Sequence, residues 1–554
     1  MAQKKCGRRS VCRCLKKTEG TDMTPATTIK TTEKIAALKL STALVAGLLF
    51  TSAANADTLR VMGGNLKIID PIVTTSGDTL IHAYMIYDKL FEFDESGVPL
   101  PQLAEKVDIS ADNKSFTIKL RDGLKFSDGT PITSDDVIQS LTRWASRDQT
   151  GQLLRARTKD LVKIDDNTLR IDLTESFDVP SALAGITGNP AFIMPKRVAS
   201  LPPTEALTDT VGSGPYQFDF STWKPGQMRV YTKNSYYIPR DEAASFYAGR
   251  KEAVMDRIEF SYVPDPNTAM ASMLTGKQDI WLDPPMANAV ALRNNPNLKV
   301  VKGYSLQGLF VINHVVPPFD NVKAKQALTY LIDQKEINAI AVGDPEFWHA
   351  CYAFLTCSGT YGNESVYDGH RGPANVEKAK ELFNEAGYDG QPVVILDPTD
   401  WPEAHARALY LAQQLREIGV KVDLQAMDWG TLTSRRTSKE PADKGGWNLF
   451  PNVMEGQPAS SPLTHLMLAS SCEKAWFGWP CDKQIEDLRA SFIRTVDIDE
   501  KKKIADELQA RASAYLPFVM TGEYNVVMSY GLNIEGFIPS APEPFFWNVR
   551  RKSQ

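Results

Sequence analysis

The chain has 554 residues, of which 43% are hydrophobic and 23% charged, with a formal net charge of −5. This length exceeds what one hydrophobic core supports, so two or three domains are expected. The acidic balance argues against nucleic-acid binding, which requires a basic surface.

Residues 1–56 predict a secretory leader. Three lysines precede an apolar run of 11 residues at 40–50, and Ala54-Asn55-Ala56 has the small residues of a signal-peptidase site. The alternative, a membrane anchor, needs about 20 apolar residues. The leader holds ten Lys and Arg but three Asp and Glu, so the mature chain from Asp57 has a net charge of about −12. Cleavage after Ala56 predicts a periplasmic protein.

The segment 101–144 has the clearest local pattern. Val107 and Ile109, and then alternate residues of 116–120, are apolar with polar residues between them, which is typical of half-buried strands. Asp112-Asn113 lies between the two runs and favours a turn. We therefore expect a β-hairpin here.

A helix is predicted to follow the hairpin. Thr133 with Asp136 three residues later forms an acidic version of a capping box. Val137, Leu141 and Trp144 then fall at i, i+4 and i+7, which places them on one buried stripe.

Helices and strands alternate further along the chain. An amphipathic helix is expected at 374–386 before Gly387, and another at 404–418 before Gly419. Residues 420–424 then alternate as a strand. This alternation predicts an α/β fold.

Four cysteines remain after the leader. Cys351 and Cys357 lie close in sequence, as do Cys472 and Cys481. In an oxidising compartment this proximity favours the bridges Cys351–Cys357 and Cys472–Cys481. The other two connectivities, and free buried thiols, are the alternatives.

The sequence has no recognisable catalytic motif. Its six histidines show no HExxH spacing, and no GxSxG, P-loop or dinucleotide-binding motif is present. Asp135-Asp136 and Asp165-Asp166 could be general acid–base pairs, but neighbouring carboxylates at turns and helix starts are more often caps. We expect no enzyme activity, no metal and no cofactor.

A series of longer motifs runs through the chain. They are Pro101-Gln102-Leu103-Ala104-Glu105, Leu120-Arg121-Asp122-Gly123, Phe126-Ser127-Asp128-Gly129-Thr130-Pro131, Gly212-Ser213-Gly214-Pro215-Tyr216, Trp223-Lys224-Pro225-Gly226, Pro317-Pro318-Phe319-Asp320 and Ala386-Gly387-Tyr388. In these motifs the chain resembles the solute-binding family 5 proteins of ABC importers, which include dipeptide- and oligopeptide-binding proteins.

The resemblance implies a fold and its domains. The expected fold is the two-lobed periplasmic binding protein fold of type II, with an extra inserted subdomain. Lobe I would comprise 57–97, 210–305 and 521–554, with 98–209 as the insert, and lobe II would comprise 313–520. Two crossing segments, Tyr304–Asn313 and Met520–Val527, would form the hinge, and Gly308 could absorb backbone rotation there.

The resemblance also implies a site between the lobes. Contacts from lobe I are expected near Thr75 and Ser76. Lobe II would contribute three segments, namely 397–401, the helix 429–435 and the loop after Trp447. The residues expected to bind ligand are Thr75, Ser76, Trp401, Trp429, Arg435, Met454, Glu455 and Gln457, with Arg436 as the alternative to Arg435 for holding a carboxylate.

The aromatic residues are consistent with a ligand cleft. Trp401, Trp429, Trp447, Trp476 and Trp479 all fall in the expected lobe II. A large aromatic ring gives much contact area, and few of its side-chain torsions have to be fixed when a ligand binds. For a single tryptophan, however, packing in the core is the ordinary role.

One departure from the family concerns the ligand. Peptide binders usually place an aspartate in the loop that here reads Val453 to Gln457, and this chain has none. Glu455 or Gln457 would have to hold an amino group, which leaves modified peptides and opine-like conjugates open.

The expected function is that of a monomeric periplasmic receptor. It would deliver a peptide or peptide-like solute to the permease and ATPase subunits of an ABC importer. The alternatives are a secreted hydrolase with an unrecognised site and a sensory or chaperone-like binder on the same fold.

Overall fold

The computed structural model describes residues 57–552, except 187, 203, 204, 206, 222 and 496. The predicted leader, its cleavage after Ala56 and the three cysteines of the leader lie outside the described residues. Within the described part, no helix is both long and apolar enough to cross a membrane.

The main sheet is mixed and combines segments from most of the chain. Its strands are β1 (Thr58–Met62), β8 (Tyr216–Phe218), β9 (Arg229–Lys233), β10 (Arg257–Ser261), β11 (Ile280–Leu282), β12 (Leu298–Ile312), β13 (Trp348–His349), β14 (Val393–Pro398), β15 (Val422–Met427), β16 (Leu449–Glu455) and β17 (Phe518–Gly531). Their order is β15-β14-β16-β12-β17-β11-β1-β10-β9-β8, and β13 pairs with β17. β14 is parallel to β15, and β1 is parallel to β10 and β11, whereas β12 is antiparallel to both neighbours.

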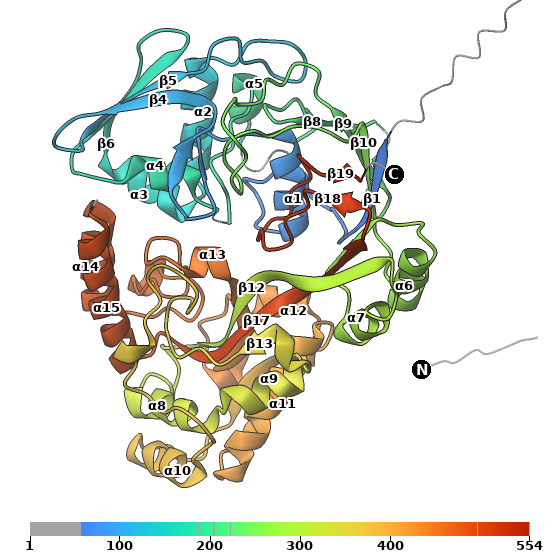
Figure 1. Ribbon diagram of the computed structural model, residues 1–554. Coiled ribbons are helices and arrows are strands. Elements are labelled where there is room, and N and C mark those ends of the chain that lie inside the picture. Colours follow the sequence, from blue (N-terminus) through green and yellow to red (C-terminus); the bar gives the residue numbers. More distant parts are fainter. Residues whose placement is uncertain are drawn as a thin grey trace, which may run out of the picture. The chain divides into compact units, whose positions relative to one another are not determined.

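Two long strands form the centre of this sheet. β12 has 15 residues and β17 has 14, and they pair from Leu298 opposite Gly531 to Val311 opposite Phe518. Figure 1 shows them side by side, passing from the region beside α7 to the part that holds β13. Both predicted crossing segments, 304–313 and 520–527, fall on these two strands.

Gly308 lies inside this ladder and is paired on both sides. Val453 of β16 and Gly522 of β17 are its partners. A Cβ at Gly308 would lie 2.5 Å from the Thr521 hydroxyl, so the small residue permits a close approach of the two strands. The structure thus gives this glycine a packing role.

A second, four-stranded sheet confirms the predicted hairpin. It contains β4 (Ala104–Ile109), β5 (Ser115–Leu120), β6 (Thr158–Lys163) and β7 (Thr168–Leu173) in the order β4-β5-β7-β6. Asn113 in the β4–β5 turn has a φ of +53°, a backbone conformation that asparagine tolerates. Two-stranded ladders join β2 (Phe91–Phe93) to β3 (Pro99–Pro101) and β18 (Ile534–Glu535) to β19 (Arg550–Arg551).

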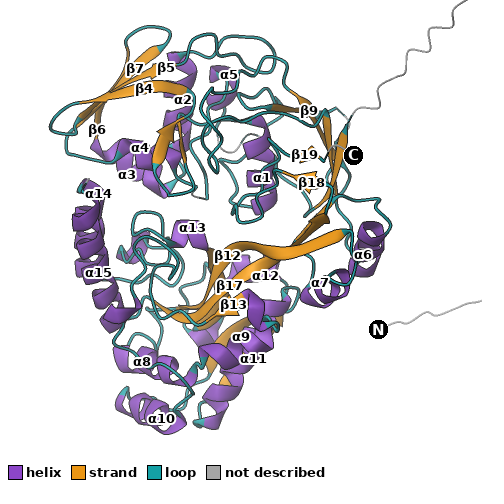
Figure 2. Cartoon of the chain, in the orientation of Figure 1, coloured by secondary structure: helices purple, strands orange, loops and turns teal. Residues whose placement is uncertain are grey.

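The helices surround these sheets (Figure 2). In the first half of the chain they are α1 (Gly77–Ile86), α2 (Ser134–Trp144), α3 (Gln149–Arg157), α4 (Val179–Ala184), α5 (Lys196–Ala199), α6 (Pro266–Leu274) and α7 (Met286–Leu292). In the second half they are α8 (Val322–Leu331), α9 (Gln334–Ala341), α10 (Val376–Glu385), α11 (Pro402–Glu417), α12 (Trp429–Arg435), α13 (Gly456–Ala459), α14 (Lys483–Arg494) and α15 (Ile498–Tyr515).

The sequence patterns located three of these helices. The capping box predicted at Thr133 is present, and the backbone N–H of Thr133 donates to Asp136 over 2.9 Å at the start of α2. The predicted helices 374–386 and 404–418 are α10 and α11 within two residues at each end. The strand that follows begins at Val422 because Val420 still belongs to the turn after Gly419.

Alternate residues of β12 enter two different cores. Leu309 and Val311 pack in a cluster that includes α15, whereas Phe310 and Ile312 pack in a cluster that includes α8 and α11. Both faces of this half of the sheet are therefore covered, as expected where parallel and mixed strands carry helices. A third and larger cluster joins residues 59–306 to the C-terminal segment 524–549.

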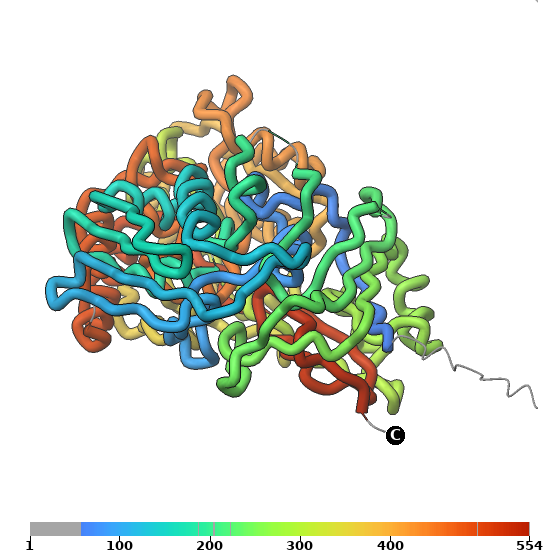
Figure 3. The backbone as a smooth tube through the Cα atoms, turned by 90° about the horizontal axis from the view of Figure 1, so that it is seen from above, coloured from blue at the N-terminus to red at the C-terminus, as the bar shows by residue number. Residues whose placement is uncertain are grey.

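The C-terminal segment returns to the start of the described chain. The Arg551 guanidinium binds the Asp279 carboxylate over 2.8 Å and the Thr58 carbonyl over 2.7 Å. Phe546 and Trp547 of the same segment are fully buried. Figure 3 shows this last segment in red close to the first strand in blue.

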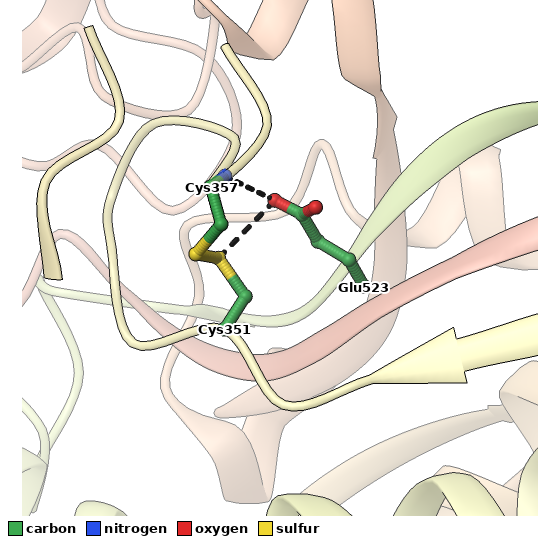
Figure 4. Close-up of side chains that lie close together, drawn as sticks. All are labelled: Cys351, Cys357 and Glu523. Carbon is green, nitrogen blue, oxygen red and sulfur yellow. Dashed lines mark hydrogen bonds between the residues drawn. A yellow bond between two sulfur atoms is a disulfide. The ribbon is translucent and has the colours of Figure 1, made fainter. Parts of the chain in front are cut away.

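Both predicted disulfides are confirmed. Cys351 bonds to Cys357 and Cys472 to Cys481, with Cα–Cα distances of 5.9 and 4.0 Å. The buried Glu523 carboxylate of β17 accepts a hydrogen bond from the Cys357 backbone N–H over 2.8 Å, which fixes the first bridge to the central sheet (Figure 4).

Candidate ligand-binding site

A cavity of about 220 Å³ lies beside the two central strands, β12 and β17. Residues from other segments of the chain complete its lining. Its volume is close to that of a small organic molecule. The lining residues are Asp283, Pro284, Met286, Tyr304, Leu306, Val342, Trp401, Glu403, Val453, Glu455, Tyr524, Asn525, Val526 and Val527. Carboxylates and aromatic side chains thus line one cavity that is partly open to solvent.

The central strands form one wall of the cavity. Leu306 of β12 pairs with Tyr524 of β17, and Ser305 pairs with Asn525. The register shifts between Lys302 and Ser305, a β-bulge that includes Tyr304. Tyr304 and Leu306 are two residues apart, so the alternation of a strand places both on the same face, and both line the cavity wall.

A tight turn after β11 presents Asp283. This residue has a φ of +58°, which is unusual outside glycine. Its backbone N–H donates to the Val527 carbonyl of β17 over 3.1 Å, which holds the turn against the wall. The prolines that follow lead into α7, so the Asp283 carboxylate is held at the start of a rigid connection.

The start of α11 supplies a second segment. Trp401 is the N-cap residue and Glu403 lies in the first helical turn after Pro402. The Trp401 ring packs edge-to-face on Trp429, with centroids 5.0 Å apart. The Trp429 backbone N–H donates to the Asp400 carboxylate over 2.7 Å, which joins α12 to this loop.

The end of β16 supplies the third segment. Glu455 pairs with Leu306 and Met454 with Gln307, so successive side chains point to opposite faces. Val453 and Glu455 line the cavity, whereas Met454 is buried in the core. The chain then turns into α13 at Gly456, where a Cβ would overlap with the Ser305 hydroxyl.

The carboxyl groups of the cavity are held in an unfavourable environment for charge. Removal from water, and then the proximity of Glu403, raises the pKa of Asp283 to about 7. Burial likewise raises the pKa of Glu455. Glu543 lies behind Glu455 in the C-terminal segment, and burial followed by the Glu455 and Asp78 charges raises its pKa well above the usual value.

Of the residues predicted to bind ligand, Trp401 and Glu455 line the cavity. Thr75 and Ser76 are exposed at the start of α1 and lie outside the lining. The next residue, Gly77, has the Glu543 carboxylate 3.9 Å from the position of a Cβ, so this loop adjoins the acidic side of the cavity.

The predicted arginine pair has two different environments. Arg435 donates to the Gly445 carbonyl over 2.6 Å and also to Gly446, so its guanidinium fixes that loop. Arg436 instead packs on Trp429, Trp476 and Phe477, with its guanidinium carbon 4.6 Å from the Phe477 centroid. Burial lowers the pKa of Arg436 to about 10. Among the described residues Arg436 has no side-chain hydrogen-bond or ion-pair partner, so it is the member of the pair with free donors.

Gln457 and Trp429 lie next to the cavity without lining it. Gln457 belongs to α13, and its carbonyl oxygen Oε1 is buried with no hydrogen-bond partner among the described residues. Trp429 contacts the lining residue Trp401. Trp447 and Trp479, by contrast, are core residues with 0% and 7% exposure.

The sequence analysis missed Asp283, Glu403, Tyr304, Tyr524 and Glu543. Tyr304 and Tyr524 fall in segments that were assigned to the hinge. The motif Trp281-Leu282-Asp283-Pro284-Pro285 did carry a signal, since an acidic residue between a buried strand and two prolines is held rigidly. Glu543 had no local signal because its position depends on the return of the C-terminus.

A possible metal-binding cluster lies elsewhere. Among the described residues, one group of three potential ligands comes close together, Cys351, Cys357 and Glu523. Because the two sulfurs are bonded to each other (Figure 4), they are not thiolate ligands. The two cysteines form a disulfide, and the buried Glu523 carboxylate accepts a hydrogen bond from the Cys357 backbone N–H.

The fold and the cavity together define a class of protein, a two-lobed α/β protein with a cavity beside its central strands. Residues 98–471 match the family described as "Bacterial extracellular solute-binding proteins, family 5 Middle". The chain belongs to that family of extracellular solute-binding proteins.

Two curated relatives have similarity along nearly their whole length. The chain is 36% identical over 505 residues to the probable peptide ABC transporter periplasmic-binding protein y4tO of Sinorhizobium fredii, covering 90% of this chain and 94% of the relative. It is 28% identical over 533 residues to the glutathione-binding protein GsiB of Escherichia coli O157:H7, covering 91% and 95%.

Solved structures have the same fold at low sequence identity. The agropinic acid complex of AgaA from A. tumefaciens R10 matches with a TM-score of 0.74 at 22% identity, covering 90% of this chain and 99% of that one. A dipeptide-binding protein from Pseudoalteromonas sp. SM9913 in complex with Met-Leu matches with a TM-score of 0.72 at 21% identity, covering 89% and 100%.

Proposed function

We propose that this protein captures a peptide or peptide-like solute in the periplasm and delivers it to the permease of an ABC importer. The observation that carries the proposal is the cavity of about 220 Å³, which combines carboxylates and aromatic rings from both sides of the central strands. Such a mixture of aromatic contact area and a few polar groups is typical of small-molecule sites.

Opposite charges at two ends of the site support a peptide-like ligand. Carboxylates line the cavity, and the unpaired Arg436 lies beyond it, connected through Trp401 and Trp429. Arg436 would hold the ligand's carboxylate and the acidic side its amino group. The 36% identical relative, named as a probable peptide-binding protein, supports this assignment.

The proposal includes two lobes that close on the solute. Lobe I comprises 57–97, 210–305 and 521–554 with the insert 98–209, and lobe II comprises 313–520. The division is supported by the hydrophobic clusters, because one consists mainly of residues 59–306 and the C-terminal segment, with Val342, Phe347 and Ile493, while two others gather residues 309–520. Ligand shifts the open–closed equilibrium only by its greater affinity for the closed form.

The protein would act as a monomer and leave its solute unchanged. ATP hydrolysis and membrane passage would belong to the permease and ATPase subunits. The mature protein would begin at Asp57 in the periplasm, which sequencing of the N-terminus of the purified periplasmic protein can test.

Mass spectrometry of the solute released by denaturing the purified protein tests the proposal most directly. A peptide, or an amino-acid derivative with both an amine and a carboxylate, is the expected result. The recovered compound should reappear intact after incubation with fresh protein. Recovery of a cleaved product would favour the hydrolase reading, and a solute without an amine or a carboxylate would overturn the peptide assignment.

A further inference from the structure

The cavity gathers acidic side chains that no ion pair among the described residues balances. Asp283, Glu403 and Glu455 line it, and Glu543 lies directly behind Glu455. None of these four carboxylates forms an ion pair with any described residue. Glu543 is buried, whereas Glu403 and Glu455 are half-buried and Asp283 is exposed toward solvent. Like charges repel, so their gathering at one cavity requires an explanation.

Glu543 is the most informative member of this group. Its side chain is 6% exposed, yet its carboxylate receives no hydrogen bond from the described residues. The acidic neighbours that face it are Glu455 and Asp78, and the phenols of Tyr84, Tyr247 and Tyr304 surround it. Asp78 already has a partner, because Arg229 lies 3.3 Å away. Glu543 is thus a buried acceptor without a donor.

The cation next to the cavity is already engaged. Arg407 is fully buried beneath Tyr524, with its guanidinium carbon 4.5 Å from the ring centroid. It donates to the Asn338 amide oxygen over 3.2 Å and to the Glu403 carbonyl over 3.5 Å. It therefore reduces the negative potential without pairing with any of the four carboxylates.

The positions of the four carboxylates favour an extended organic ligand over a single metal ion. A divalent metal needs several oxygen ligands around one point. These four carboxylates do not converge in that way, because the metal-like cluster found among the described residues lies at Cys351, Cys357 and Glu523. Tyr304, Trp401 and Tyr524 also line the cavity, and aromatic rings attract organic cations. The site thus fits separated positive charges on one organic molecule.

We propose that the end of the solute that enters this cavity carries two positive charges, an ammonium group and a nearby amine or guanidinium. The protein would then prefer basic peptides to neutral or acidic ones. This inference rests on the proposed function, and it adds the charge of the solute to it. A carboxylate without a partner in the protein would accept a charge-assisted hydrogen bond from the solute. Each such bond would satisfy an acceptor that has no donor in the folded protein.

Isothermal titration of the purified, ligand-free protein with three matched peptide series tests the inference. The series begin with Lys, Ala or Glu and continue with about two to four alanines, so that they differ in charge at one residue. We expect the Lys series to bind at least about tenfold more tightly than the Ala series, and the Glu series to bind most weakly. Equal or weaker binding of the Lys series would overturn the inference and leave the peptide function intact.

Two variants and one further ligand complete the test. Glu543→Gln combined with Glu455→Gln should reduce the preference for the Lys series to about threefold or less, whereas Glu507→Gln, an exposed carboxylate on α15, should retain it. If no peptide binds but 1,4-diaminobutane does, the dicationic inference stands and the peptide function fails. Failure of both ligand classes would overturn both proposals.

Discussion

At the scale of single residues, the buried Glu543 carboxyl contributes to how stability depends on pH. Burial, followed by the Glu455 and Asp78 charges, raises its pKa well above the usual value. The folded protein therefore holds protons that the unfolded chain releases at a usual carboxyl pKa of about 4. By linkage, this carboxyl weakens folding progressively as the pH rises above about 4, and favours it at lower pH.

Glu543→Gln should therefore stabilise the ligand-free protein at high pH. Removing a carboxyl that must ionise without a partner should raise the midpoint of thermal unfolding by roughly 2 °C at about pH 8. The gain should be smaller at about pH 5.5, where the wild-type group is still protonated. Differential scanning calorimetry at both pH values measures the effect, with Glu507→Gln as the control. A gain that is equal or larger at the lower pH would contradict the reasoning.

Arg436 gives a second prediction at this scale. If its free guanidinium donors hold the ligand's carboxylate, Arg436→Gln should weaken binding about 10- to 100-fold, the value of a charge-assisted hydrogen bond. Amidation of the ligand's carboxyl group should weaken binding to the wild type equally.

The combined change of protein and ligand is the decisive measurement for Arg436. In a double-mutant cycle, the amidated ligand should bind Arg436→Gln no more weakly than the unmodified ligand does. Additive losses would show that Arg436 acts elsewhere. The same test cannot be made at Arg435, because the Arg435 guanidinium donates hydrogen bonds to the loop carbonyls of Gly445 and Gly446.

Site prediction at the level of residues was limited by long-range structure. The family resemblance pointed to the segments that hold Trp401 and Glu455, and both residues line the cavity. Glu543 could not, since its neighbours Asp78 and Glu455 are far away in sequence. Nor could the sequence distinguish Arg435 from Arg436, because the difference depends on which of them meets the carbonyls and which meets the aromatic rings.

At the scale of elements, one glycine controls how β16 turns into α13. A Cβ at Gly456 would overlap with the Ser305 hydroxyl and would approach the Ser305 carbonyl to 3.2 Å. Gly456→Ala should separate β16 from β12, cost about 1–3 kcal/mol of stability and displace Glu455 from the cavity. Chemical denaturation and ligand titration measure the two effects.

A matched glycine provides the control for this prediction. A Cβ at Gly63 would meet its nearest atom, on Leu282, at an ordinary 3.5 Å. Gly63→Ala should therefore change stability and ligand affinity little. If both alanine variants behave alike, the close approach at Gly456 does not position Glu455.

The sequence was more informative about elements than about individual site residues. The capping box at Thr133 and the glycine stops after α10 and α11 are local signals, so the element bounds followed from them closely. Gly308 shows the limit of such reasoning. A glycine in a predicted crossing segment indicates flexibility, but only the paired neighbours on both sides reveal that close packing also requires it.

At the scale of the whole molecule, a contact spans the mouth between the proposed insert and lobe II. Lys501 of α15 lies 3.0 Å from Asp178, which caps α4, and both side chains are largely buried. The Lys501 ammonium also lies over the Phe492 ring at 5.2 Å. This ion pair connects segments on opposite sides of the proposed hinge, so it should favour the closed arrangement.

Lys501→Met should weaken this latch while retaining the apolar stem against Phe492. Because a partly exposed ion pair contributes about 1 kcal/mol or less, we expect ligand affinity to fall about two- to fivefold, mainly through faster dissociation. Stopped-flow dissociation measures the rate. Asp178→Asn should have the same effect, since asparagine retains the helix cap. Lys503→Met, an exposed residue on the same helix, is the control. An unchanged dissociation rate in both variants would exclude the latch.

The large-scale arrangement followed from resemblance, since composition and periodicity give no domain boundaries. Length predicted more than one domain, and alternating helices and strands predicted α/β. The return of the C-terminal segment to Asp279 and Thr58, and the passage of β12 and β17 through one continuous sheet, are contacts between distant parts of the chain. No local pattern encodes them.

The continuity of β12 and β17 links recognition to mechanics. Tyr304 and Tyr524 contact the cavity from the same two strands that join the halves of the sheet. If the proposed hinge lies on these strands, a substitution there would alter both the contact with the solute and the bending stiffness of the strands. Selectivity and the speed of opening would then change together at these two positions, whereas substitutions at Trp401 or Glu403, which lie outside β12 and β17, would change selectivity alone.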